Sequence, residues 1–286
     1  MITRLAWATT TEARGLDDDE PIALAALRQA DVAVDLVDWD DPGISWAAYD
    51  RVVLRSTWDY PQRLDEFLAW LERVSRVTDL RNPLPMVRWS LDKHYLVELE
   101  RAGAPVVATA FAEPGDRPRF PAGSFVVKPA VGAGSRDAAS YDPTQHDLAA
   151  AHVDRLHAAG ASALVQPLVA SVAVDGEWPL IFLDGRYSHA ASKRVALPAA
   201  GSVDGLFAEE NNAPHTADTA QITVAQAALD VVVRRFGVPT YARVDLVRDD
   251  RGQFRVLELE MVEPSLFLPQ AEPAASLRLV KALCAP

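Results

Sequence analysis

The strongest indication of the fold is the stretch Tyr241-Ala-Arg-Val-Asp-Leu-Val-Arg-Asp-Asp-Arg-Gly-Gln-Phe-Arg-Val-Leu-Glu-Leu-Glu-Met-Val-Glu-Pro264. Two apolar runs flank a polar Asp-Asp-Arg-Gly segment, which predicts two antiparallel strands joined by a tight turn. Side chains alternate along a strand, so Arg243 and Asp245 share one face. A turn centred on Arg251-Gly252 then places Asp245 across from Glu258 and Arg243 across from Glu260.

The same alternation gathers acidic side chains on one face of the predicted hairpin. Glu258 and Glu260 point away from Leu257 and Leu259, toward the face that carries Asp245. Like charges directly opposite one another destabilise a ladder unless a cation compensates them. Carboxylate oxygens are the ligands of hard divalent ions, and a substrate phosphate can complete the coordination shell. A divalent metal site is therefore one interpretation of this face.

The sequence also allows other interpretations, of the acidic face and of the class of protein. A solvated outer face, with Arg243 and Arg255 neutralising the acids, also fits the segment taken alone. The single cysteine, Cys284, excludes a disulfide framework and a thiolate metal site, and the six histidines are scattered. A dinucleotide oxidoreductase is disfavoured because Ala8-Thr-Thr-Thr11, not a glycine-rich turn, follows the first expected strand.

Length and composition narrow the class of protein. At 286 residues and 49% hydrophobic content, the chain predicts two or three lobes with a cleft between them. No apolar run reaches the ~20 residues of a membrane span, and the N-terminus runs into an apparent strand, so we expect a cytoplasmic protein without a membrane partner. A net charge of −12 argues against a nucleic-acid surface. An acidic protein with a few lysines gathered in a cleft is instead suited to bind small anionic ligands such as nucleotides.

The order of strand and helix signals suggests three regions. Residues 1–85 form an N-terminal α/β domain, with strands at 5–8, 32–37 and 51–54 and a helix at 20–30. A break at 81–85 ends this domain. Residues 86–123 contain a linker and a small central subdomain, with a helix at 91–102 and a strand at 105–108. Residues 124–286 turn to antiparallel sheet with helices near 144–158 and 218–236. The stretch 197–216 is long for an ordered loop and is interpreted as a mobile lid.

A second chemical signal is the run Phe125-Val-Val-Lys-Pro129, with Gly132-Ala-Gly134 just beyond it. A lysine in an apolar strand is costly without an anionic partner, and glycines let backbone N–H groups approach a phosphate. This interpretation assigns Lys128 to a phosphate site. An ordinary glycine turn beside a solvated lysine is the alternative.

Two weaker signals lie on either side of that run. The extended stretch 163–169 contains Gln166, whose amide suits a purine edge, although a strand at an interdomain hinge fits equally well. The end of the strand at 51–54 is followed by polar and aromatic residues that suit an amino-acid substrate, because ligands of open α/β sheets gather at the carboxyl ends of strands. These residues are Arg55, Thr57, Trp58 and Tyr60, and aromatic packing around a solvated arginine is the alternative.

The order of these motifs from Trp89 onward resembles the ATP-grasp superfamily. The pair Arg-x-Asp followed by Glu-x-Glu is specific in both its spacing and its strand context. The resemblance implies mixed α/β and α+β architecture: an ATP-grasp fold with an N-terminal Rossmann-like domain. It implies nucleotide contacts from Lys93, Lys128, Gly132, Gly134, Ser135, Gln166, the backbone of Leu168, Glu177 and Lys193. It implies two Mg²⁺ ions, with Mn²⁺ as a substitute, on Asp245, Glu258 and Glu260. The commonest pattern in these ligases is Glu-x-Asn, so the last glutamate adds charge here.

A narrower resemblance covers most of the chain. Arg55-Ser-Thr-Trp58, the run from Val87 to Lys93, Asp184-Gly-Arg-Tyr-Ser-His189 and Met261-Val-Glu-Pro-Ser265 are similar to the O-ureido-serine cyclo-ligases of cycloserine biosynthesis. The resemblance implies a small amino-acid-like substrate that Glu263 and Ser265 also contact, and a monomer or homodimer.

The chemistry implied by these resemblances is acyl-phosphate ligation. The substrate carboxylate attacks the γ-phosphate while Mg²⁺ and Lys128 neutralise charge, and Arg243 stabilises the acyl phosphate. We therefore expect an ADP-forming ligase with Arg243, Lys128 and Lys193 as catalytic residues, whose nitrogen nucleophile belongs to the same molecule. An intermolecular amino-acid ligase and a non-catalytic nucleotide-binding regulator remain the alternatives.

Overall fold

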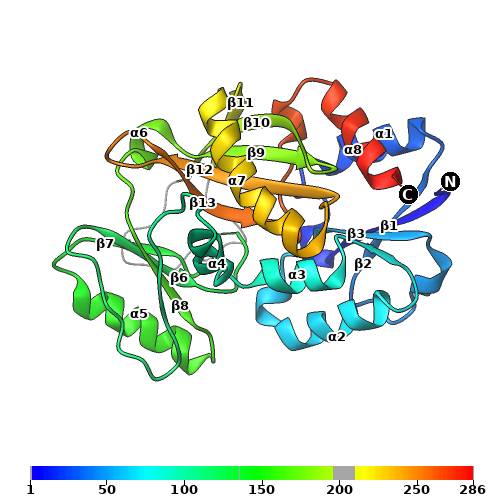
Figure 1. Cartoon of the computed structure of the whole chain (residues 1–286). Helices are drawn as coiled ribbons and strands as arrows, with labels where there is room; N and C mark the ends of the chain where they lie inside the picture. Colours follow the sequence, from blue (N-terminus) through cyan, green and yellow to red (C-terminus); the bar gives the residue numbers. More distant parts are fainter. Residues whose placement is uncertain (1, 135, 196–209, 286) are drawn as a thin grey trace.

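The computed structural model describes residues 2–134, 136–195 and 210–285. These residues form three β-sheets with helices packed on them (Figure 1). The N-terminal sheet is parallel, with strand order β2-β1-β3-β4, and its apolar residues are buried on both faces. Leu5 and Trp7 pack toward α1 and α8, whereas Ala6 and Ala8 pack toward α2. The elements of this part are β1 (Arg4–Thr9), η1 (Thr11–Ala13), α1 (Glu20–Gln29), β2 (Ala33–Asp38), η2 (Trp46–Ala48), β3 (Arg51–Ser56), η3 (Tyr60–Gln62), α2 (Leu64–Val74) and β4 (Asp79–Arg81).

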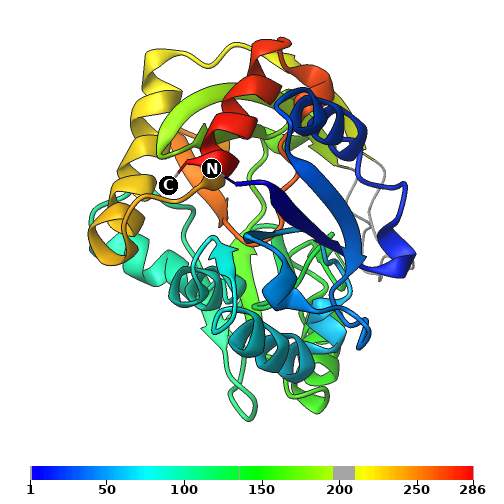
Figure 2. The same cartoon turned by 90° about the vertical axis from the view of Figure 1, so that its right-hand side faces the viewer.

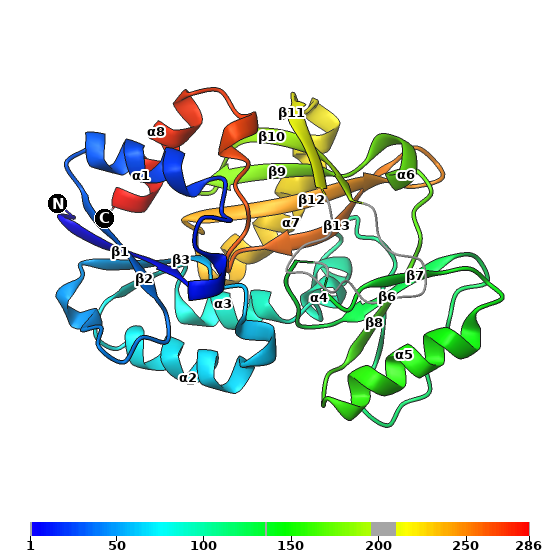
Figure 3. The same cartoon turned by 180° about the vertical axis from the view of Figure 1, so that it is seen from behind.

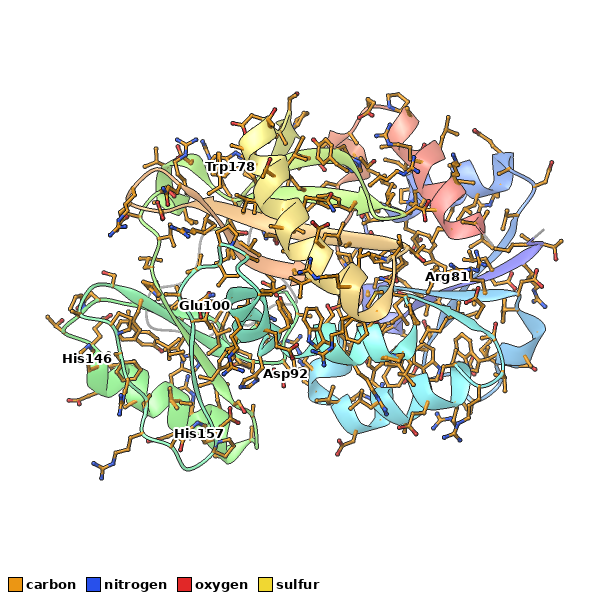
Figure 4. All side chains as sticks on the ribbon, in the orientation of Figure 1. Arg81, Asp92, Glu100, His146, His157 and Trp178 are labelled. Atoms are coloured by element: carbon orange, nitrogen blue, oxygen red, sulfur yellow. The ribbon has the colours of Figure 1, made fainter. Side chains whose placement is uncertain are left out.

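The region after β4 differs from the sequence expectation. The predicted break at 81–85 is present but shorter: β4 ends at Arg81, and Pro83 is the N-cap of a helix whose first turn tolerates Pro85. The helix predicted at 91–102 is confirmed by α4 (Tyr95–Arg101), but it begins later than predicted, because Leu91 belongs to a separate helix, α3 (Leu84–Leu91). They part at Asp92, which is extended and accepts a hydrogen bond from the His94 N–H at 3.0 Å (Figure 4).

A second sheet is antiparallel, with order β5-β8-β6-β7, and α5 covers one of its faces. The strand predicted at 105–108 is wrong, because only an isolated bridge from Val106 to Val256 forms there and the strand lies further on. The elements are β5 (Ala110–Ala112), β6 (Phe125–Pro129), β7 (Ala139–Tyr141), α5 (His146–Ala158) and β8 (Ala163–Pro167). The predicted helix near 144–158 is thereby confirmed.

The third sheet is antiparallel, with order β11-β10-β9-β12-β13, and α7 packs on one face of it (Figure 3). Asp218 caps α7 by accepting from the Gln221 N–H, in a reciprocal capping box. The predicted lid at 197–216 is wrong in its last part, since β11 pairs with β10, and 197–209 lie outside the described residues. The elements are α6 (Val172–Asp175), β9 (Trp178–Leu183), β10 (Arg186–Val195), β11 (Glu210–His215), α7 (Thr219–Phe236), β12 (Tyr241–Arg248), β13 (Phe254–Glu260), η4 (Leu268–Gln270) and α8 (Ala274–Cys284).

The two ends of the chain share one core. Helix α8 packs against α1 and against the third sheet, beside the N-terminal sheet (Figure 2). The guanidinium group of Arg51 on β3 donates to the carbonyl oxygens of Leu283 and Ala285. The N-terminal sheet is therefore completed by the last helix. Within the described ranges, no helix has the length and apolar character needed to cross a bilayer.

Candidate active site

The candidate site is a cleft of about 390 Å³, lined by strands of the second and third sheets and by loops of the N-terminal part. The N-terminal part contributes Trp58 and Tyr60, the second sheet contributes Lys128 and Gln166, and the third contributes the face of β12 and β13 opposite α7. Five cationic side chains of the described residues line this cleft, and all but Arg136 form ion pairs with acidic side chains: Lys93, Lys128, Arg136, Lys193 and Arg243.

The β12–β13 pairing confirms the predicted register. Arg243 pairs with Glu260 and Asp245 with Glu258, and all four side chains are on the cleft side or directly beneath it. A β-bulge then shifts the ladder, so that Leu246 pairs with Val256.

The bulge corrects one part of the sequence interpretation. Leu257 was expected to share the core face with Leu259, but Leu257 lines the cleft, whereas Val256 and Leu259 are buried under α7. The extra residue of the bulge moves Leu257 to the ligand side without moving Glu258 from it. A strict two-residue alternation could not place both there.

Arg243 is the centre of the ionic network. Its Nε and Nη2 lie 2.8 and 2.9 Å from the two carboxylate oxygens of Asp245, and Nη2 lies 2.5 Å from Glu260 Oε1. The side chain is buried, 6% exposed, and its Nη1 donates to the Ser265 carbonyl oxygen at 3.4 Å. Burial opposes its charge, but the Asp245 and Glu260 carboxylates raise the pKa of Arg243 well above its usual value.

Three lysines complete the network. Lys93 and Lys128 approach the Glu258 carboxylate at 3.0 and 3.7 Å. Burial opposes ionisation of Glu258, yet the two lysines hold its pKa well below the usual range. Lys193 lies 2.8 Å from Glu177 and 3.5 Å from Asp245. These residues are far apart in the sequence, and the fold brings them together in the cleft.

The carboxylates of Asp245, Glu258 and Glu260 suit a hard divalent cation, but they would have to exchange their present ion pairs to bind one. In the described part of the chain, no three acidic, histidine or cysteine side chains converge closely enough to hold a metal ion. Asp245 and Glu260 are engaged by Arg243, and Glu258 is engaged by lysines. Burial raises the pKa of Glu260 to about 7, which indicates a carboxylate short of positive charge. Oxygen-only donors with excess negative charge suit Mg²⁺ rather than a softer metal.

The second sheet and its glycine turn form the end of the cleft where nucleotide contacts were predicted. Gly132 and Gly134 line the cleft, and Gly134 has a φ of +65°, which disfavours any side chain there. Ser135 lies outside the described residues. Gln166 is buried and donates from Nε2 to Thr109 Oγ1 at 2.9 Å. The Leu168 N–H donates to the Ser124 carbonyl oxygen at 2.8 Å, so an adenine contact there falls to the Leu168 carbonyl oxygen.

The opposite end contains part of the predicted substrate set. Trp58, Tyr60, Glu263 and Ser265 line the cleft, and Tyr60 donates to Glu263. Burial and the neighbouring Glu260 raise the pKa of Glu263 to about 8.

The other two predicted substrate residues do not reach the cleft wall. Arg55 and Thr57 are 2% and 0% exposed and lie behind it. Arg55 donates instead to Asp19 at 3.2 Å. The prediction of direct substrate contact by Arg55 and Thr57 is therefore not supported by their position, because the packing of Trp7 and Tyr241 around Arg55 holds it inside.

Sequence reasoning missed two features of the cleft. Arg136 lines it, and among the described residues it forms no ion pair. Asp17, Asp18 and Asp19 also line the cleft, and the sequence analysis assigned them no role. A run of three acids directly between the first strand and the first helix is the signal that could have identified them.

Comparison with known proteins connects this geometry to a family. The family of N-terminal domains of D-cycloserine synthetase DcsG matches residues 5–82. The chain is 40% identical over 292 residues to the cycloserine biosynthesis protein DcsG of Streptomyces lavendulae, over 98% of this chain and 97% of that protein. The chain belongs to the DcsG family.

Solved structures agree with this assignment. The crystal structure of D-cycloserine synthetase DcsG superposes with a TM-score of 0.91 at 39% identity and covers 98% of each chain. The D-alanine–D-alanine ligase of Bacillus anthracis has a TM-score of 0.67 at 13% identity, with 99% of this chain and 96% of that one covered. The ATP-grasp ligase PsnB has a TM-score of 0.62 at 17% identity, with 99% and 100% covered. The predicted ATP-grasp fold is confirmed, and this DcsG homologue is an ATP-grasp ligase.

Proposed function

We propose that this DcsG homologue activates the carboxylate of a small amino-acid-like substrate, of the O-ureido-serine kind, and closes a ring onto a nitrogen of the same molecule. The observation that carries the proposal is the meeting of Arg243 and three lysines with the carboxylates of β12 and β13 in one cleft, in a chain similar to DcsG over its whole length. Four fixed cations suit a reaction in which negative charge moves between phosphate and carboxylate oxygens.

The nucleotide lies between the second and third sheets in this proposal. Lys93, Lys128 and Lys193 face the phosphates, and the glycine turn with Ser135 covers them. Gln166 and the Leu168 carbonyl oxygen meet the adenine, and Glu177 meets the ribose. Each of these roles requires a cation or polar group at the cleft wall, and the lysines and Glu177 already lie there in ion pairs that a ligand would exchange.

Asp245, Glu258 and Glu260 would hold divalent ions, two Mg²⁺ or Mn²⁺ in their place. Such ions supply charge neutralisation for phosphoryl oxygens during transfer. The chain's own contribution is to present three carboxylates from paired strands at fixed register. Lys93 and Lys128 neutralise Glu258 until the ligands arrive, which keeps the acidic face compatible with folding.

Two bond exchanges make up the reaction. A carboxylate oxygen of the substrate attacks the γ-phosphorus, the bond to the β–γ bridging oxygen breaks, and ADP leaves. The nitrogen then attacks the carbonyl carbon, its proton is lost, and the C–O bond to phosphate breaks. Arg243 lies where it can stabilise the acyl phosphate and the tetrahedral oxyanion, because its guanidinium group is buried at the cleft and oriented by Asp245.

The test is a coupled ADP-release assay with Mg²⁺ present, in which O-ureidoserine and other amino acids are supplied singly and in pairs. Release of ADP and phosphate from a single compound, with a cyclic product by mass spectrometry, is the expected result. Release only with a second amino acid, with a condensed product, would replace ring closure by intermolecular ligation. ATP binding without any turnover would indicate a regulatory protein.

A further inference from the structure

The substrate end of the cleft holds an acidic pair whose ligand is not yet assigned. Asp17 and Asp19 stand between η1 and α1, at the carboxyl end of the N-terminal sheet, and both line the cleft. They are 5% and 2% exposed. Buried carboxylates are retained only where partners compensate them, so their hydrogen bonds can be counted one by one.

Asp19 is fully engaged by the protein. Its carboxylate accepts from the backbone N–H groups of Leu266 and Leu268, the latter at 2.7 Å, and from Arg55 Nη2 at 3.2 Å. It thereby holds the loop that carries Ser265 and Phe267 against the N-terminal lobe. Asp19 is a positioning residue for that loop.

Asp17 is not fully engaged. Its Oδ1 accepts from the Asp19 N–H at 3.0 Å, but its Oδ2 is buried without a hydrogen-bond partner and lies 4.0 Å from Arg55 Nη2. Two buried carboxylates therefore share the guanidinium group of Arg55, and Asp17 has the more distant place beside it. Burial raises the pKa of Asp17, as expected for a carboxylate that lacks a cation.

The surroundings of Asp17 favour an organic cation. Aromatic rings of Trp58, Tyr60 and Phe267 line the same end of the cleft, and ammonium groups bind well between carboxylates and aromatic faces. Arg243 is close enough for its charge to act on Asp19. The acidic corner thus adjoins the residue assigned to the reacting carboxylate, as recognition of an α-amino acid requires, because its ammonium and carboxylate groups share one carbon.

We propose that Asp17 binds the α-ammonium group of the substrate and selects α-amino acids over their deaminated counterparts. Asp19 and Arg55 act behind it, by positioning the loop and the carboxylate. The inference rests on the proposed function, whose substrate class it makes narrower. It also gives Arg55 a role that its buried position allows.

The test compares O-ureidoserine with its 2-hydroxy analogue, in which a hydroxyl replaces the ammonium group. In the wild-type protein the analogue should show a KM higher by about 10- to 100-fold, the loss expected for one charge-assisted hydrogen bond. Asp17→Asn should raise the KM for O-ureidoserine by a similar factor, with the KM for the analogue and for ATP unchanged. Glu12→Gln, on the exposed short helix η1, is the matched control and should change none of these values.

Two results would overturn the inference. Equal use of both compounds by the wild-type protein would show that the ammonium group is not recognised, and this comparison needs no variant to fold. An equal rise in KM for both compounds in Asp17→Asn would show a merely structural role. If O-ureidoserine causes no release of ADP, the proposed function is wrong, but the inference about Asp17 can still be tested. Calorimetry then compares the binding of serine and of glycerate in the presence of a non-hydrolysable ATP analogue. The inference requires that serine binds and that glycerate binds at least about tenfold more weakly.

Discussion

Arg243 and Asp245 form a two-bonded ion pair along a single strand, with the two nitrogen–oxygen distances at 2.8 and 2.9 Å. The pair faces the cleft and is buried, so movement of the arginine would leave Asp245 with Lys193, at 3.5 Å, as its remaining cationic partner among the described residues. A cation that approaches Asp245 must therefore compete with Arg243 or share the carboxylate with it. This competition makes the arginine sensitive to ligand binding in the same cleft.

Arg243→Lys keeps the charge but removes the planar two-bonded geometry. We expect kcat to fall by about 100-fold, as for the loss of an oriented oxyanion donor, with ATP affinity little changed. Steady-state kinetics and calorimetry separate the two quantities. Arg255→Lys, on the partly exposed hairpin end, is the control, and wild-type kcat in Arg243→Lys would remove Arg243 from the chemistry.

ATP binding should require a divalent ion, because the carboxylates of Asp245, Glu258 and Glu260 would otherwise face the phosphates directly. Calorimetric titration of ATP should show a loss of affinity of about tenfold or more on addition of EDTA, restored by excess Mg²⁺. The same affinity with and without EDTA would contradict the metal assignment.

Glu260→Gln should leave the fold intact and weaken Mg²⁺-dependent turnover. Burial raises the pKa of Glu260 to about 7, so a neutral side chain of the same shape is tolerated by the apo protein. The melting temperature should stay within a few degrees of wild type, while the Mg²⁺ concentration at half-maximal turnover increases by about tenfold. Full turnover of the variant at the wild-type Mg²⁺ concentration would show that Glu260 is not a metal ligand but an ordinary acidic residue on a solvated face.

Lys128→Ala should reduce nucleotide affinity much more than stability. Glu258 keeps Lys93 at 3.0 Å when Lys128, at 3.7 Å, is removed, so no carboxylate is left unpaired. Thermal unfolding and ATP calorimetry are measured together, with Lys281→Ala on the exposed face of α8 as the control. A large fall in melting temperature with unchanged ATP binding would make Lys128 a structural partner.

Stability should decrease as pH falls below about 6.5, the ordinary pKa of histidine. Burial lowers the pKa of His189 in the folded state, and its Nε2–H donates to the Leu266 carbonyl oxygen at 2.6 Å. Below pH 6.5 the unfolded chain therefore binds a proton that the folded chain excludes, so unfolding becomes more favourable. Urea titrations from pH 7.5 to 5 should show a shallower pH dependence in His189→Asn. The exposed His146→Asn is the control, and an unchanged slope in His189→Asn would contradict the argument.

Local pattern was enough to predict much of the site. The pairing of Arg243 with Glu260 and of Asp245 with Glu258 follows from strand alternation and the position of the turn, and the structure has both. The bulge at Leu257 could not be predicted, since an extra residue leaves the periodic pattern nearly unchanged.

The acidic corner could not be predicted for a different reason. The carboxylate of Asp19 meets the N–H groups of Leu266 and Leu268 across sequence separations of 247 and 249 residues. No periodicity reports such a contact. Arg55 was assigned to the surface of the cleft because it ends a strand, and only the packing of Trp7 and Tyr241 shows it to be buried.

The shared core of the two chain ends has a consequence for synthesis on the ribosome. The first strands are synthesised early, but the apolar side of their sheet that carries Leu5 and Trp7 is covered in part by α8, whose residues follow much later in the sequence. The N-terminal lobe therefore keeps apolar surface uncovered until α8 has been synthesised. The acidic corner at Asp17 and Asp19 is completed after a similar delay, because its loop partners are Leu266 and Leu268.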